Sequence, residues 1–338
     1  MINNNINKFK EKFNNFNFEK YPQNSRIHKL FKLTNKETTV FIKRDDELGF
    51  GASGSKIRKY LSLIPFIKKQ NFNEVIIIGS SHSNNILTAT QLLIENEISP
   101  ILFLFGKKKE KISGNYLLTR LFVDQKSIYW IENSLSEIEK YILNYINEKK
   151  LVNKKVGYIP EGAFCPEALP GACTLALDII KNELDYNLEF NHIFIDAGTG
   201  FIAISLILSF LFLKRKTIIH VLLLSGNQES FKSNLENLKV EFEKNFNKIG
   251  TNIINYLLYF PSNAKSFGST NSKTFHEIKK ISSEYGIITD PIYSSKLFFE
   301  SRKIITESKL KGNILIIHSG GGLSLFGFEN KILKLTTS

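Results

Sequence analysis

The chain has 338 residues, of which 42% are hydrophobic and 23% are charged; these values are typical of a folded globular protein and exclude a disordered or membrane-embedded one. At roughly 100–200 residues per domain, the length predicts two domains or one large α/β unit. The 45 Lys and Arg against 32 Asp and Glu give a net charge of +13. The basic residues are mostly scattered lysines, without a zinc knuckle, an aromatic RNA-binding motif or an arginine-rich run, so we expect no nucleic-acid partner.

The two cysteines, Cys165 and Cys173, have neither the C-x-x-C spacing of a metal or redox site nor the number needed for a disulfide framework, so we expect no metal. The segment Met1–Lys8 lacks the apolar core of a signal peptide, and the longest apolar run, Phe201–Leu213, is too short to span a bilayer. We therefore expect a cytoplasmic protein without a membrane partner.

Residues 1–25 are rich in Asn and Lys and predict an irregular arm over the surface. From about residue 38 onward, short β-branched runs alternate with amphipathic stretches, the pattern of βαβ units around a mostly parallel sheet. The predicted strands are Thr39–Lys43, Glu74–Gly79, Pro100–Phe105, Ser127–Ile131, His192–Ala197, Ile218–Leu224 and Asn313–His318. The predicted helices lie near 56–70, 82–96, 112–123, 134–149, 168–186, 200–214, 228–246, 272–285 and 295–309.

The segment 41–56 predicts a strand, an acidic turn and a glycine cluster, followed by Lys56 at the start of a helix. The spacing of Gly49 and Gly54 is that of a phosphate-binding P-loop, but the order Gly54-Ser55-Lys56 departs from the Gly-Lys-Ser/Thr that a P-loop requires. A lysine at a helix N-terminus has its pKa lowered by the helix dipole. This favours an amine that forms a Schiff base, although a surface lysine is the alternative for this segment alone.

A second candidate site follows the buried strand predicted at the start of the segment 75–85. Small polar residues at the N-terminus of the next helix form a site suited to a carboxylate. Ser83, Asn84 and Asn85 offer backbone and side-chain donors there, with ordinary helix capping as the alternative. His82 is a candidate proton shuttle or a structural histidine.

A third candidate site is the turn Gly198-Thr199-Gly200, which lies between a predicted strand and a predicted helix and offers N–H groups to a phosphate. The same stretch matches the loose dinucleotide pattern G-x-G-x-x-A. That pattern expects an acid at the end of the next strand, where Leu224-Ser225-Gly226-Asn227 has none. A phosphate monoester therefore fits better than a nicotinamide dinucleotide.

Two further segments, Asp290-Pro291-Ile292-Tyr293 and His318-Ser319-Gly320-Gly321, are ambiguous alone. In their order, from about Thr39 to Phe328, these motifs resemble the family of 1-aminocyclopropane-1-carboxylate deaminase and D-cysteine desulfhydrase, which uses pyridoxal 5′-phosphate (PLP). The resemblance implies an α/β fold like that of tryptophan synthase β, with two three-layer αβα domains, mostly parallel sheets and PLP in the cleft between them. It also implies a homodimer. We expect a larger domain of residues 1–55 plus 168–338 and a smaller one of 56–167.

The resemblance also implies roles for individual residues. The G-x-K-x-R-K pattern of the family places the PLP lysine at Lys56, followed by Arg58 and Lys59. Its S-N pair places Asn84 on the PLP 3′-oxygen and Ser83 facing the substrate. We expect His82 and Asn85 to contact the substrate together with this pair. The remaining motifs are the I-P-E-G segment Ile159–Gly162, the phosphate loop Gly198, Thr199 and Gly200, a catalytic Tyr293, and Ser294 or Ser319 at the pyridine nitrogen.

Departures from the family pattern guide the prediction of the reaction. The deaminases have a glutamate after the D-P-x-Y tyrosine that keeps the pyridine nitrogen protonated, whereas this chain has Ser294, and Phe267 stands where relatives have a second tyrosine. A hydroxyl at the nitrogen makes a weaker electron sink. We therefore predict β-elimination from D-cysteine to sulfide, ammonia and pyruvate.

Three alternatives remain open. The first is a 1-aminocyclopropane-1-carboxylate deaminase or another lyase of β-substituted amino acids. The second is a homologue that binds PLP or a ligand without turnover, because Phe201 and Ile202 follow the phosphate loop where relatives have small or hydroxyl residues. The third is a nicotinamide oxidoreductase, which the missing ribose acid disfavours.

Overall fold

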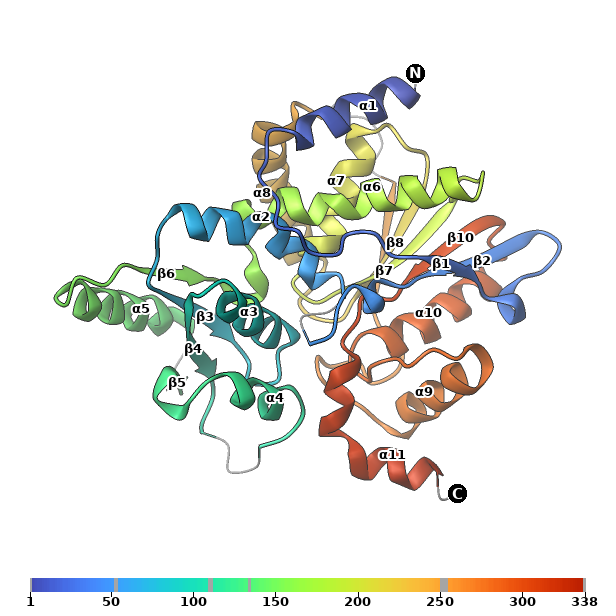
Figure 1. Cartoon of the computed structure of the whole chain (residues 1–338). Coiled ribbons are helices and arrows are strands. Elements are labelled where there is room, and N and C mark those ends of the chain that lie inside the picture. The colour runs from blue at the N-terminus through green and yellow to red at the C-terminus, as the bar shows by residue number, and fades with distance from the viewer. Residues whose placement is uncertain (1, 52–53, 109–111, 133–134, 250–254, 337–338) are drawn as a thin grey trace.

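The chain folds around two β-sheets, seen in a computed structural model that describes residues 2–51, 54–108, 112–132, 135–249 and 255–336 (Figure 1). One sheet has the strand order β1-β2-β10-β7-β8-β9 and the other the order β5-β4-β3-β6. Only β1 is antiparallel to its neighbour among the pairs formed by the described residues. The strands are β1 (Ile27–Lys29), β2 (Thr38–Lys43), β3 (Glu74–Gly79), β4 (Ser99–Phe105), β5 (Ile128–Ile131), β6 (Val156–Ile159), β7 (His192–Ala197), β8 (Ile218–Leu223), β9 (Tyr256–Tyr259) and β10 (Gly312–Ile317).

Helices cover both faces of each sheet. In Figure 1, α6, α7 and α8 lie over one face of the larger sheet and α9 and α10 over the other, while α5 and α3 lie on opposite faces of the smaller sheet. The helices are α1 (Ile2–Phe13), α2 (Lys56–Lys69), α3 (Asn84–Glu95), α4 (Gly114–Phe122), α5 (Leu135–Lys150), α6 (Leu169–Asp185), α7 (Phe201–Phe212), α8 (Gln228–Phe246), α9 (Ser272–Tyr285), α10 (Ser294–Glu307) and α11 (Glu329–Thr336). The predicted α/β class with two mostly parallel sheets is confirmed.

The strand sequences explain the layers. In β7, Ile193 and Ile195 face the cluster formed with α6 and α7, whereas Phe194 between them faces the cluster formed with α10. Side chains of a strand alternate between faces, so a strand covered on both sides is apolar throughout. The apolar run Ile193–Ile195 is what made this strand predictable.

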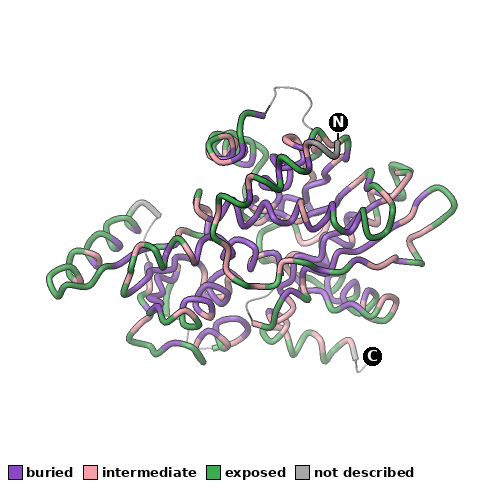
Figure 2. The backbone as a smooth tube through the Cα atoms, turned by 45° about the horizontal axis from the view of Figure 1, so that its top comes forward, coloured by how far each residue is buried: buried purple, intermediate pink, exposed green. Residues whose placement is uncertain are grey.

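Helix α2 connects the two halves of the molecule. It packs against α6 beside the larger sheet and against α3 beside the smaller one, and one hydrophobic cluster contains Ile77 of β3, Ile57 of α2 and Ile195 of β7. Figure 2 shows buried backbone through this central region. The smaller sheet draws its strands from residues 74–159; the domain limits at 55/56 and 167/168 remain a prediction.

The prediction of an irregular arm over residues 1–25 is wrong for the stretch that forms α1. Ile6, Phe9 and Phe13 are buried on one side of this helix, and the Phe9 ring lies 5.3 Å from that of Phe212 and 5.2 Å from that of Phe246. Their spacing of three and four residues is the helical period. The asparagine and lysine residues between these three side chains give the segment a polar composition, so the helical spacing was not recognised in the sequence.

Some short elements were not predicted, namely β1, β6, β9 and α11, and their small size gives little periodicity to detect. Residues 52–53 of the glycine cluster and residue 134, where one helix was predicted to begin, lie outside the described residues. Within the described ranges, no helix has both the length and the apolar character needed to cross a bilayer.

Candidate active site

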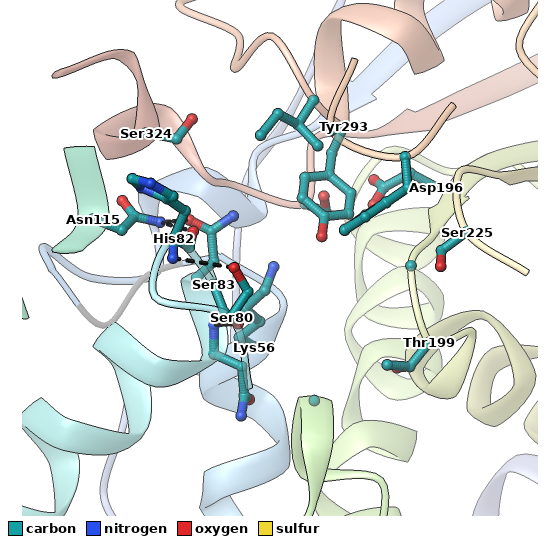
Figure 3. A pocket seen from close by; sticks show the side chains of 18 of the residues that line it. Lys56, Ser80, His82, Ser83, Asn115, Asp196, Thr199, Ser225, Tyr293 and Ser324 are labelled. Carbon is teal, nitrogen blue, oxygen red and sulfur yellow. Dashed lines mark hydrogen bonds between the residues drawn. The ribbon is translucent and has the colours of Figure 1, made fainter. Parts of the chain in front are cut away.

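A cavity of about 630 Å³ opens where parallel strands of both sheets end (Figure 3). Ligands of α/β proteins bind at this carboxyl edge because the loops and helix N-termini converge there. The structure brings most of the predicted site residues together around this cavity: Lys56, His82, Ser83, Asn84, Asn85, Gly198, Thr199, Gly200, Tyr293 and Ser319. Ser294 is not among its lining residues.

Lys56 is the first residue of α2, and its Nζ lies 5.3 Å from the centre of the Tyr293 ring. Burial lowers the pKa of Lys56, against the opposing effect of the carboxylates of Asp196 and Asp290. A lowered pKa increases the fraction of neutral amine, which is the form that attacks a carbonyl or accepts a proton.

Backbone contacts fix the position of Lys56. The amide of Ser55 donates to the carbonyl of Ser319 at 2.9 Å. The preceding Gly54 has φ +74°, and a Cβ there would lie 2.0 Å from the same carbonyl oxygen. Only glycine allows the chain to approach this closely in this conformation. The start of α2 is therefore held against the loop that follows β10.

A buried ionic network anchors α2 from the opposite side. The Arg58 guanidinium contacts Asp45 and Asp178, each at 2.7 Å, and Lys43 Nζ lies 2.6 Å from Asp178. Burial alone would raise the pKa of Asp45, but the charge and hydrogen bonds of Arg58 hold it well below its usual range. The network joins β2, α2 and α6, which explains why an arginine follows Lys56 by two positions.

At the N-terminus of α3, Ser83 caps the helix, and its Oγ accepts a hydrogen bond from the Asn85 amide at 3.1 Å. The hydroxyl proton of Ser83 stays available to a ligand, because accepting a bond does not use it. Asn85 is buried, and Tyr60 donates to its Oδ1 at 3.2 Å. Its Nδ2 has no partner among the described residues. His82 lines the same wall of the cavity.

Asn84 is oriented by a residue that the sequence did not single out. The Nδ2 of Asn115 donates to Asn84 Oδ1 at 2.7 Å and to the His82 carbonyl at 3.0 Å. Because its acceptor oxygen is used, Asn84 presents its amide nitrogen on the other side, where a Cβ on Gly321 would lie 3.1 Å from it. Asn115 comes from α4, and its position depends on how that helix packs on α3.

The loop Gly198–Gly200 leads into α7, whose first-turn N–H groups have no partner within the helix. Gly200 adopts φ +82°, a left-handed conformation that turns the chain into the helix. A Cβ on Gly198 would lie 3.2 Å from the Tyr293 ring. Phe201, the first residue of α7, is buried, and both it and Ile202 line the cavity.

Lys59 lies one turn after Lys56 and faces the same loop. Its Nζ donates to the Gly162 carbonyl at 2.5 Å and lies 5.0 Å from the centre of the Phe201 ring. Burial, and then the charge of Lys56, lower the pKa of Lys59 to about 7. The I-P-E-G segment thus contributes a backbone carbonyl that positions a second lysine.

Tyr293 lines the cavity and Ser294 does not, although they are adjacent. The Asp290 carboxylate accepts from the amides of Tyr293 and Ser294 at 2.9 and 2.7 Å, and from Ser294 Oγ at 2.7 Å. This capping interaction holds the Ser294 hydroxyl inside the protein. Burial raises the pKa of Tyr293, so its hydroxyl remains protonated. Of the two serines predicted to meet the pyridine nitrogen, Ser319 lines the cavity and Ser294 does not.

Two acidic residues line the cavity for which the sequence predicted no role: Asp196 near the end of β7, and Glu161 of the I-P-E-G segment after β6. Burial raises the pKa of both. Asp196 follows three apolar residues of β7, and the last three residues of this strand, Ile195, Asp196 and Ala197, all line the cavity. In the described part of the chain, no cluster of His, Cys, Asp and Glu side chains is arranged to hold a metal.

The chain is 28% identical over 296 residues to a putative 1-aminocyclopropane-1-carboxylate deaminase of Pyrococcus horikoshii, covering 88% of each protein. It is 27% identical over 310 residues to a mitochondrial bifunctional D-cysteine desulfhydrase/1-aminocyclopropane-1-carboxylate deaminase of Arabidopsis thaliana, covering 88% of this chain and 76% of that protein. A crystal structure of a 1-aminocyclopropane-1-carboxylate deaminase homologue matches with a TM-score of 0.86 and 27% identity, covering 97% of this chain and 99% of the other. No protein-family model matches. Sequence and fold together show that the chain is a distant homologue of the 1-aminocyclopropane-1-carboxylate deaminase and D-cysteine desulfhydrase family.

Proposed function

We propose that the chain is a PLP-dependent lyase that removes a β-leaving group from a small amino acid, with D-cysteine as the preferred substrate and sulfide, ammonia and pyruvate as products. The observation that carries this proposal is Lys56, whose pKa is lowered by burial, in a cavity that also holds an oriented amide donor and a helix N-terminus. When bound, PLP supplies an electron sink for the charge that develops at the substrate Cα.

The residues of the cavity fit PLP. The amine of Lys56 suits its aldehyde carbon, and Asn84 Nδ2 suits its 3′-oxygen because Asn115 already occupies Asn84 Oδ1. The N–H groups at Gly198–Gly200 suit its phosphate, with Lys59 as a nearby cation. Buried polar atoms without a partner call for a ligand, and the cavity has Asn85 Nδ2 and Asp196 Oδ1 in this state among the described residues.

The substrate would lie between α3 and Tyr293. Its carboxylate suits the N-terminus of α3, where the Ser83 hydroxyl still has a proton to donate and Asn85 Nδ2 is unpaired. The neutral amine of Lys56 would accept the Cα proton. The Tyr293 hydroxyl orients the substrate or donates a proton to the departing group, because its raised pKa keeps it protonated.

Deamination of 1-aminocyclopropane-1-carboxylate is the second candidate, supported by the names of the relatives. Against it stands Phe267, whose ring lies 6.1 Å from that of Tyr293 and has no hydroxyl to offer. A homologue that binds PLP without turnover is the third candidate function. We also propose that the protein is a homodimer and that its ligand is a small amino acid.

Product analysis separates these candidates. The purified protein, loaded with PLP, is incubated separately with D-cysteine, L-cysteine and 1-aminocyclopropane-1-carboxylate, with Lys56→Ala as the inactive control. Sulfide and pyruvate from D-cysteine in excess over L-cysteine support the proposal. Formation of 2-oxobutanoate and ammonia from the cyclopropane amino acid, without sulfide from D-cysteine, would assign the deaminase instead. PLP bound to the protein without any product would assign the non-catalytic homologue.

A further inference from the structure

Asp196 is an acidic side chain without a role in the chemistry proposed above. It lies near the end of β7, two residues before the phosphate loop, and lines the cavity. Figure 3 shows it beside Tyr293, across the cavity from Ser83. A buried carboxylate that follows three apolar residues and faces a ligand site indicates a role for its charge.

The protein itself only partly satisfies this carboxylate. Its Oδ1 is inaccessible to solvent and has no hydrogen-bond partner among the described residues. Burial raises the pKa of Asp196, while a hydrogen bond with the Ser319 hydroxyl and the charge of Lys56 lower it. No arginine or lysine of the described chain comes within salt-bridge distance. A cationic ligand group would complete the environment of this carboxylate.

The neighbours of Asp196 indicate which group that is. In PLP, the pyridine nitrogen lies across the ring from the carbon that carries the aldehyde. The 3′-oxygen and the phosphate arm are attached on the aldehyde side of the ring, away from the nitrogen. The aldehyde is assigned to Lys56 and the phosphate to Gly198–Gly200, so the nitrogen faces away from α2. The strand ends of β7 and β10, which pair side by side, present Asp196 and Ser319 on that side.

We propose that Asp196, supported by the Ser319 hydroxyl, binds the pyridine nitrogen of the cofactor and keeps it protonated. This inference rests on the proposed PLP function and concerns the strength of its electron sink. The hydroxyl of Ser294 is held by Asp290 and does not compete for the position. An acid in place of a hydroxyl gives a strong sink, so the absence of an acid after Tyr293 no longer weighs against opening of a cyclopropane ring.

The test compares the natural cofactor with 1-deaza-PLP, in which carbon replaces the ring nitrogen, on the wild-type protein and on Asp196→Asn. Asparagine preserves the shape of the side chain and removes its charge. Asp185→Asn is the matched control, because Asp185 is an exposed acid at the end of α6 paired with Lys181. Dissociation constants for both cofactors are measured on all three proteins, and the ¹⁵N chemical shift of ring-labelled PLP reports nitrogen protonation directly.

A charge-assisted hydrogen bond to the nitrogen predicts that the wild type and Asp185→Asn prefer PLP over the analogue by about tenfold or more. Asp196→Asn should lose most of this preference, and the ¹⁵N shift should change from a protonated to an unprotonated nitrogen. An unprotonated nitrogen in the wild type, or an unchanged shift and preference in Asp196→Asn, would overturn the assignment while leaving PLP at Lys56. If PLP itself does not attach to Lys56 in the wild type, the proposed function is overturned as well.

Discussion

Asn115 on α4 fixes the orientation of Asn84 at the start of α3, with its Nδ2 donating to Asn84 Oδ1 at 2.7 Å. The same donor holds the His82 carbonyl at 3.0 Å. A residue outside every recognisable motif therefore decides which end of the Asn84 carboxamide is presented to the ring oxygen of a cofactor.

Replacing Asn115 with Ala should weaken PLP binding by about fivefold, because loss of one such hydrogen bond costs about 1 kcal/mol and frees Asn84 to rotate. Absorbance titration with PLP measures the effect. Asn96→Ala is the matched control, since Asn96 lies at the other end of α3 and bonds Tyr21 and Leu92 outside the cavity. Equal affinities in the two variants would show that Asn115 does not position Asn84 for the cofactor.

Tyr293→Phe separates proton donation from binding. The raised pKa keeps the Tyr293 hydroxyl protonated, and general acids contribute typically 10²–10⁴-fold to rate. We expect kcat with D-cysteine to fall by about 10²-fold or more, while PLP affinity changes little. With β-chloro-D-alanine, whose chloride leaves without a proton, the loss of kcat should be much smaller. The same loss with both substrates would assign Tyr293 to positioning.

Lys59 should make anion binding depend on pH. Its pKa is lowered to about 7, so the side chain is charged below that pH and largely neutral above it in the ligand-free protein. The ratio of phosphate affinity between wild type and Lys59→Gln should therefore be largest near pH 6 and approach one near pH 9. Taking the ratio cancels the titration of phosphate itself. Lys68→Gln, on the same helix but paired with Glu19 at the surface, should give a ratio near one throughout.

Arg58→Met should destabilise the fold strongly, because it leaves Asp45 and Asp178 as buried charges with Lys43 as the one cation near them among the described residues. Removing one partner of a buried pair costs about 3–5 kcal/mol, which urea unfolding would measure. Lys181→Met, which removes an exposed ion pair with Asp185, is the control and should not change the midpoint measurably. A similar midpoint for both variants would show that the network contributes specificity and not stability.

Most strands and most helices could be predicted because their apolar periodicity is local, whereas the short strands β1, β6 and β9 could not. Lys56, Ser83, Asn84, Tyr293 and the loop after β7 could be predicted because ordered motifs marked them. Asn115 and Asp196 could not, since one depends on the packing of α4 on α3 and the other on which face of β7 meets the cavity. The sequence also could not show that Ser294 would be held by Asp290.

The most direct test of the central claim is to locate the cofactor on the chain. The PLP-loaded protein is reduced with borohydride, digested, and its labelled peptides are sequenced by mass spectrometry, with Lys56→Ala as the comparison. We predict a yellow protein that bleaches on reduction, a pyridoxyl label on Lys56, and neither colour nor label in the variant. A label on Lys59 or another lysine, or no label at all, would contradict the account.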